Sequence, residues 1–116
     1  MRTIVSILLL SILLTHCAPK FTESKSLAFN KQLKEMAETD QIAAFIPQGK
    51  YKEYTKEQWL KFQDSVFANN KIKAEEMFTK YGFMGFDKVG KDGSYHFWLI
   101  VQHCDKYPAF QKKVLK

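Results

Sequence analysis

The chain contains little of several residue types that would mark a specialised class of protein. Its 116 residues include 2 Cys, 3 Pro and 5 Gly, which excludes a disulfide-stapled mini-protein, collagen and a Pro/Gly-rich disordered chain. No repeat or low-complexity stretch is present. Hydrophobic residues make up 46% of the chain and aromatic residues 15%. We therefore expect one small domain with an ordinary apolar core.

The chain also lacks an apolar run long enough to cross a bilayer as a helix. The uncharged residues 3–14 (TIVSILLLSILL) follow Arg2, and as a helix they rise only about 18 Å, short of the roughly 30 Å hydrocarbon core. A short apolar run behind a basic residue is typical of a signal peptide. Cleavage after Ala18 would leave Pro19 as the first residue, which suits an ordinary signal peptidase poorly. Cys17 is therefore the better candidate for the first mature residue.

Leu14, Thr15 and Cys17 resemble the lipobox of a bacterial lipoprotein, in which the cysteine becomes the lipid-modified first residue of the mature chain. His16 stands where that pattern normally has a small residue. The resemblance implies palmitate-type lipidation at Cys17 and a location in the bacterial cell envelope, with the domain facing the periplasm or the exterior. It divides the chain into a signal peptide (1–16), a lipidated tether (17–23) and a helical domain (24–116).

Charge is spread along the chain rather than gathered in one place. The net charge is +6, from 18 Lys+Arg and 12 Asp+Glu. Lys31, Lys34, Glu35 and Glu38 alternate in sign, which is typical of a solvated helix face and not of a stripe that follows phosphates. We expect no nucleic acid partner. The expected partners are the lipid bilayer, reached through Cys17, and an envelope protein or cell-wall component.

Apolar periodicity predicts an all-α fold, a single-domain bundle of about three to four helices. The first helix is expected from Ser24 to Phe45, ending before Pro47. Thr55 and Gln58 have the spacing of a capping box, which predicts the start of a second helix. The buried face of that helix is expected to contain Trp59, Phe62, Val66, Asn70, Ala74, Met77 and Tyr81.

Four glycines fall within residues 82–93, in the second half of the chain. Gly82 is expected to end the second helix in a left-handed conformation, and Asp92-Gly93 is expected to form a turn. Residues 95–104 (YHFWLIVQHC) suit either a strand or a buried helix, and we favour a helix that is apolar nearly all round and central. Pro108 is expected to begin a last helix, whose buried face starts with Phe110, Val114 and Leu115.

Four polar side chains fall on faces that should be buried: Asp40, Asn70, His96 and His103. Because a lone buried polar group costs several kcal/mol, roughly 2–7 for a neutral one, such residues normally find each other. We therefore expect a shared polar cluster. It has three interpretations, namely hydrogen bonds that fix the register of the helices, a ligand-binding site, or a catalytic site with His103 as general base, oriented by Asp40 or Asp105.

Metal and thiol chemistry are weaker interpretations of the same region. His96 and His103, together with Asp40, would supply three ligands, but two residues seven apart on a helix are separated by about 10.5 Å. No metal or other cofactor is therefore expected. Cys104 is expected to be a small buried hydrophobic residue without a disulfide to Cys17, although the neighbouring His103 leaves a nucleophilic thiol as the alternative.

The order of several short motifs resembles a bacterial family known only as a domain of unknown function, over about residues 24–115. The motifs are Asp40-Gln41, Asn70 twelve residues before Gly82, Val89-Gly90, Gln102-His103-x-Asp105 and Gln111. The resemblance implies a largely helical, exported or lipid-anchored protein. It also implies a polar centre made of Asp40, Gln41, Asn70, Gln102, His103 and Asp105.

The chain departs from the family pattern in two places. Ala43 and Ala44 stand where an arginine is expected, and the family's portion beyond the helix of Gln111 is missing, which implies a C-terminally truncated member. The family has no established activity to carry over. The expected function is a membrane-anchored, non-enzymatic binding or scaffold module whose binding residues are Asp40, Gln41, Asn70, Gln102 and His103. A hydrolase-like enzyme that uses His103 as general base is the alternative.

Overall fold

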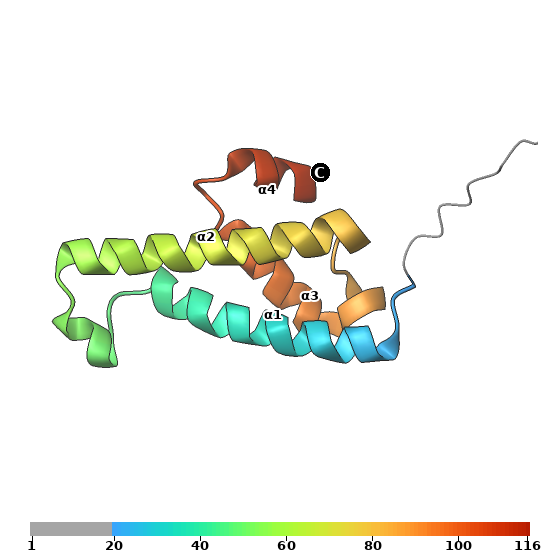
Figure 1. Cartoon of the computed structure of the whole chain (residues 1–116), viewed down its shortest axis with the longest axis horizontal. Helices are drawn as coiled ribbons and strands as arrows, with labels where there is room; N and C mark the ends of the chain where they lie inside the picture. Colours follow the sequence, from blue (N-terminus) through green and yellow to red (C-terminus); the bar gives the residue numbers. More distant parts are fainter. Residues whose placement is uncertain (1–19) are drawn as a thin grey trace, which may run out of the picture.

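The computed structural model describes residues 20–116, which form a small bundle of four α-helices without strands (Figure 1). This confirms the all-α fold that the apolar periodicity predicts. A 3₁₀ helix, η1, lies between the first two α-helices. The elements are α1 (Glu23–Ala44), η1 (Gly49–Glu53), α2 (Lys56–Tyr81), α3 (Phe86–Gln102) and α4 (Pro108–Val114).

The first two helices begin and end close to the predicted residues. α1 begins one residue before Ser24, because the side chain of Thr22 caps it by accepting a hydrogen bond from the Lys25 amide at 3.2 Å. α2 has the predicted capping box. The Gln58 amide donates to the Thr55 hydroxyl at 3.1 Å, and the Thr55 amide donates to the Gln58 side chain at 2.8 Å.

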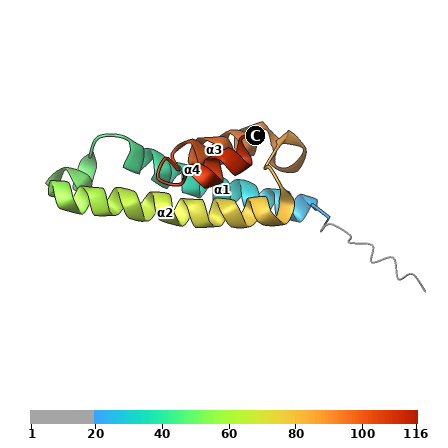
Figure 2. The same cartoon turned by 90° about the horizontal axis from the view of Figure 1, so that it is seen from above.

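The long helices α1 and α2 lie side by side, and α3 and α4 cover the pair from one side (Figures 1 and 2). α1 contacts both α2 and α3, and α2 and α3 also contact each other. The core forms where these helices meet, and the C-terminal helix α4 packs on α3. The core residues are Leu33, Met36, Ala37, Ala74, Met77, Met84, Val89, Phe97, Ile100, Val101, Cys104, Phe110 and Val114.

Residues 95–102 are helical, as favoured, but α3 begins earlier than predicted. It starts at Phe86, so the prediction of a turn at Asp92-Gly93 is wrong. The chain bends instead at Gly90, whose φ of 68° and ψ of −174° are open essentially to glycine alone. Gly93 is buried inside the helix, and its site has no room for a side chain. A Cβ there would lie 2.7 Å from Cβ of Val89 and collide with the Asn30 side chain of α1.

Three smaller expectations are also corrected. α3 is not apolar all round, since Tyr95 is 55% exposed and Trp98 is 42% exposed, and their rings stack on the outside of the bundle. Leu115 follows the end of α4 and is exposed, whereas Phe110 and Val114 are buried as predicted. Gly82 has the expected positive φ of 76°, but its ψ of −161° lies outside the left-handed helical region.

The expected signal peptide (1–16) and the lipidation site Cys17 lie outside the described residues. Among residues 20–116, no helix is both long and apolar enough to cross a membrane.

The bend at Gly90 can be tested with one substitution. In a continuous helix, Gly90→Ala would stabilise the fold by about 1 kcal/mol, because alanine favours helix over glycine. At the observed positive φ the same change is expected to destabilise the fold by about 1–3 kcal/mol. Urea unfolding of residues 20–116, followed by circular dichroism, measures the difference. Lys91→Ala, at the adjacent exposed position, is the control, and a higher unfolding midpoint for Gly90→Ala would contradict the bend.

Candidate functional site

The centre of the polar cluster is a contact between Asp40 of α1 and His103 at the C-terminal end of α3. Asp40 lies on the buried face of α1 and is 0% exposed. Its Oδ2 contacts Nδ1 of His103 and also accepts a hydrogen bond from the Gln41 side chain at 3.3 Å. We call this contact the Asp40–His103 bridge. It joins two residues that are 63 positions apart in the chain.

The position of His103 is fixed by its place as the C-terminal cap of α3. Its backbone amide donates to the Leu99 carbonyl at 3.3 Å, and its ring lies 5.9 Å from the ring of Phe67 on α2. The imidazole side chain is 29% exposed. With Nδ1 in contact with Asp40, Nε2 is the ring nitrogen that Asp40 does not engage.

Asn70 connects α2 to the cluster. It is buried on α2, and its side-chain amide donates to the Met36 carbonyl of α1 at 3.2 Å, one helical turn before Asp40. Asp40, Gln41 and His103 are therefore in direct contact, and Asn70 binds the adjacent turn. The expectation that polar residues on three buried faces share one region agrees with these contacts.

Only one of the two carboxyl oxygens of Asp40, Oδ2, has hydrogen-bond partners within residues 20–116. Its Oδ1 is buried and has no hydrogen-bond partner among residues 20–116. Burial raises the pKa of Asp40 above the ordinary 3.8, and the contacts with His103, Gln41 and Asn70 oppose this effect only in part. The bridge therefore stabilises a charge that would be costly to bury alone.

Gln102 and Asp105 occupy a second hydrogen-bonded group around Gln111 of α4. The side-chain amide of Gln111 donates to the carbonyls of Val101 at 3.1 Å and Gln102 at 3.0 Å, and to the Asp105 carboxylate at 3.3 Å. These bonds satisfy carbonyls at the end of α3. Asp105 is exposed and contacts Gln111, so Asp40 is the carboxylate that orients His103.

His96 and Cys104 lie apart from the bridge. His96 is half-buried between α1 and α3. Residues 20–116 contain no group of three or more His, Cys, Asp and Glu side chains arranged to hold a metal ion. Cys104 is buried and donates from Sγ to the Ile100 carbonyl at 3.3 Å. Burial, followed by the nearby Asp40, raises the pKa of Cys104 to about 12, so the thiol stays protonated at neutral pH.

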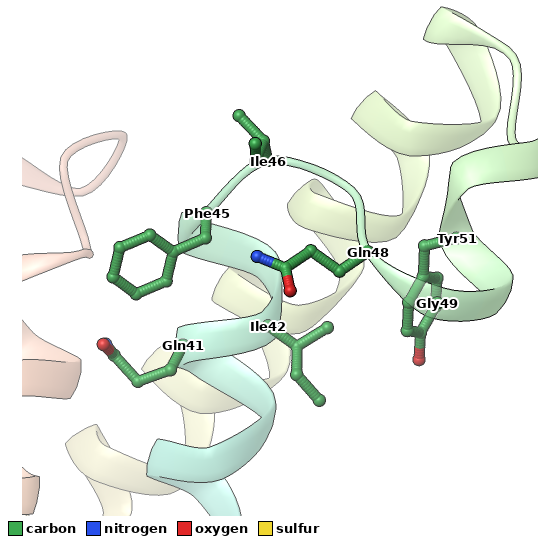
Figure 3. A pocket seen from close by; sticks show the side chains of 7 residues that line it. All are labelled: Gln41, Ile42, Phe45, Ile46, Gln48, Gly49 and Tyr51. Carbon is green, nitrogen blue, oxygen red and sulfur yellow. The ribbon is translucent and has the colours of Figure 1, made fainter.

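Two hollows with mainly apolar walls lie along the C-terminal half of α1, and no pattern in the sequence predicts them. One hollow of about 510 Å³ lies between α1 and α3, and another of about 450 Å³ lies between the end of α1 and η1. The two share Gln41 and Ile42, and we call them together the α1 groove. Figure 3 shows the second hollow, with Ile42 of α1 and Tyr51 of η1 on its two sides.

The walls of the α1 groove contain apolar side chains that are strongly exposed to solvent. Phe45 is 63% exposed and Ile46 is 76% exposed at the α1 end, and Tyr95 and Leu99 line the α3 side. These residues escaped prediction because they lie off the apolar stripes that define the core. Asp40 and His103 line neither hollow.

Comparisons of the chain with models of known protein families, with curated proteins and with solved structures gave no match.

Removing one partner of the bridge tests what it contributes. His103→Ala is expected to lower the free energy of unfolding by about 3 kcal/mol at pH 7, because it leaves the Asp40 carboxylate buried without its partner. Adding Asp40→Asn to this variant is expected to restore most of the loss, since the buried charge is then absent. Urea unfolding of residues 20–116 measures both effects.

The same variants have a predicted pH dependence. A folded-state pKa of Asp40 above 3.8 means that the folded protein holds this proton more tightly than the unfolded chain does. The stability from the protonated form is complete below pH 3.8 and is lost as the pH rises through the folded-state pKa. His103 lowers the pKa of Asp40, so His103→Ala raises it further and the variant gains more stability than the wild type as Asp40 is protonated. The deficit of His103→Ala is therefore expected to shrink between pH 7 and pH 4, and an unchanged deficit would contradict this assignment.

Proposed function

We propose that the protein is a bacterial envelope lipoprotein, held on a membrane by a lipid on Cys17, whose helical domain is a non-enzymatic binding or scaffold module. One observation carries the binding part of this proposal. The α1 groove is an open hollow with exposed apolar walls, whereas Asp40 and His103, the residues that would perform chemistry, contact each other between the helices.

The groove has the character of an interaction surface. Ile42, Phe45 and Ile46 are exposed at the end of α1, and Tyr95 and Trp98 are exposed on the adjoining helix α3. Single exposed apolar residues are ordinary, but a contiguous apolar hollow on a small domain is typical of a site that another molecule covers. Polar groups border the apolar walls, as they do in protein–protein interfaces, and Lys34, Glu38 and Gln41 supply them here.

A hydrolase-like activity is the second candidate, and one feature favours it. Asp40 orients His103 in the manner of a carboxylate–histidine pair, and the imidazole is partly exposed. Against it, the two hollows of the α1 groove are lined by neither Asp40 nor His103. A binding function is therefore the better supported of the two.

The anchoring part of the proposal rests on the sequence, since Cys17 lies outside the described residues. The lipobox-like residues before Cys17 support it, and so does the resemblance to an exported helical family. Cys104 is buried and protonated, which leaves Cys17 as the cysteine available for lipid modification.

Metabolic labelling tests the anchor. The full chain, expressed in a bacterium supplied with radiolabelled palmitate, is expected to carry label and to sediment with membranes. Cys17→Ser is expected to abolish both, because the thioether that carries the lipid cannot form. Cys104→Ala is the matched control and is expected to retain the label. Label that persists in Cys17→Ser would overturn the proposed anchor.

Photocrosslinking tests the groove as a binding site. A benzoylphenylalanine in place of Phe45 in the full chain is expected to give an adduct of discrete size in cells, because a bound molecule would cover this side chain. The same group in place of Ile72, exposed on α2 away from the groove, is the control and is expected to give none. Equal adducts at both positions, or none at either, would contradict a groove-specific partner.

A further inference from the structure

The outer face of α1 bears a regular stripe of side chains. Leu27, Lys31, Lys34 and Glu38 are exposed, Gln41 is half-buried, and Phe45 caps the helix. Their spacings alternate between four and three residues, which places them in one line along the helix, as at the contact positions of a coiled coil. Figure 3 shows Gln41 and Phe45 pointing to the same side of α1.

The stripe is complementary to a second copy of itself that runs in the opposite direction. Around Met36, positions 34 and 38 are equidistant and have opposite charges, and positions 27 and 45 are equidistant and apolar. If a second α1 lies antiparallel across the first, Lys34 meets Glu38 of the second copy. Leu27 likewise meets Phe45 of the second copy. Every such contact occurs twice, as a two-fold interface requires.

We propose that the α1 groove binds a second copy of this chain, with the two α1 helices packed antiparallel about a two-fold axis near Met36. This inference rests on the proposed binding function of the groove and names its partner. The spacing of the stripe is that of coiled-coil contact positions, but only its two ends are apolar, so charge pairing in the middle sets the register.

The side chains of the stripe are free to make these contacts. Lys34 and Glu38 lie one helical turn apart, yet neither forms an ion pair within the part of the chain that the structure describes. Leu27 is 67% exposed, as strongly as Phe45 at the opposite end of the stripe. The second helix would therefore remove apolar surface from water at both ends and pair the charges in the middle.

The groove provides room for the second helix beside this stripe. Lys34, Glu38 and Gln41 form the α1 wall of the hollow, and Tyr95 and Leu99 form the α3 wall. A helix that packs on the stripe therefore also contacts α3 of the first copy, and the reverse holds by symmetry. The two-fold axis, perpendicular to α1, places the N-terminal ends of the two α1 helices at equal height along the axis.

Cysteine crosslinking in membranes tests the register. The full chain with Leu27→Cys and Phe45→Cys is expected to form a covalent dimer on oxidation with copper phenanthroline, because these positions meet between copies. Within one chain they are separated by about 27 Å along the helix, so they cannot bridge each other. Each single variant, in which like positions are equally far apart between copies, is the control and is expected to stay monomeric on a denaturing gel.

A charge swap separates specific pairing from collision. Lys34→Glu, added to the double-cysteine chain, is expected to lower the dimer yield about fivefold, because like charges then face each other twice. Adding Glu38→Lys as well is expected to restore the yield, because the charges are again complementary.

Two results would overturn the dimer. One is a single-cysteine variant that crosslinks as well as the double variant, and the other is a charge swap that fails to restore the yield. An adduct to a different protein at Phe45, without a dimer of this chain, would overturn the inference and leave the proposed binding function standing. Absence of both the dimer and any groove-specific adduct would overturn both.

Discussion

The Asp40–His103 bridge is the interaction on which the arrangement of the helices depends. A buried carboxylate is costly, and one oxygen of Asp40 has no hydrogen-bond partner within residues 20–116, so the contact of the other oxygen with His103 fixes where α3 ends relative to α1. Asn70 fixes α2 against the preceding turn of α1 in the same way. Gln111 then binds the carbonyls at the end of α3, which places α4. Each helix after α1 is therefore tied to an earlier helix by a polar contact as well as by the apolar core.

The residues of this network were predictable because each one breaks a local pattern. Asp40 and Asn70 interrupt apolar stripes, and the capping box at Thr55 is a local signal that needs no tertiary contact. The bend at Gly90 was not predictable, since which of several glycines takes a positive φ depends on how closely α1 and α3 approach at Gly93. The choice between Asp40 and Asp105 as partner of His103 was left open for a similar reason. It depends on three-dimensional proximity, which sequence spacing does not contain.

The α1 groove could not be predicted from apolar periodicity, because the exposed side chains that line it lie off the apolar stripes that define the core. Ile42, Phe45 and Ile46 look like ordinary residues at the end of a helix until η1 folds back beside them. The two faces of α1 thus have different roles. Its inner face is occupied by the bridge and the core, and its outer face is free for a partner. The Asp40–His103 bridge and the exposed apolar side chains therefore lie on different faces of the same helix.

The wide separation of Asp40 and His103 in the chain has a consequence for the order of folding. The group that compensates the buried charge of α1 lies 63 positions further along the chain, beyond α2, so it leaves the ribosome after both long helices. Until His103 and Gln111 have emerged, α1 and α2 would have to bury Asp40 unpaired, which disfavours premature folding. The pairing of α1 with α2 is thus completed only when the residues that end α3 have joined it, so the buried charge couples the folding of the two long helices to the arrival of a third.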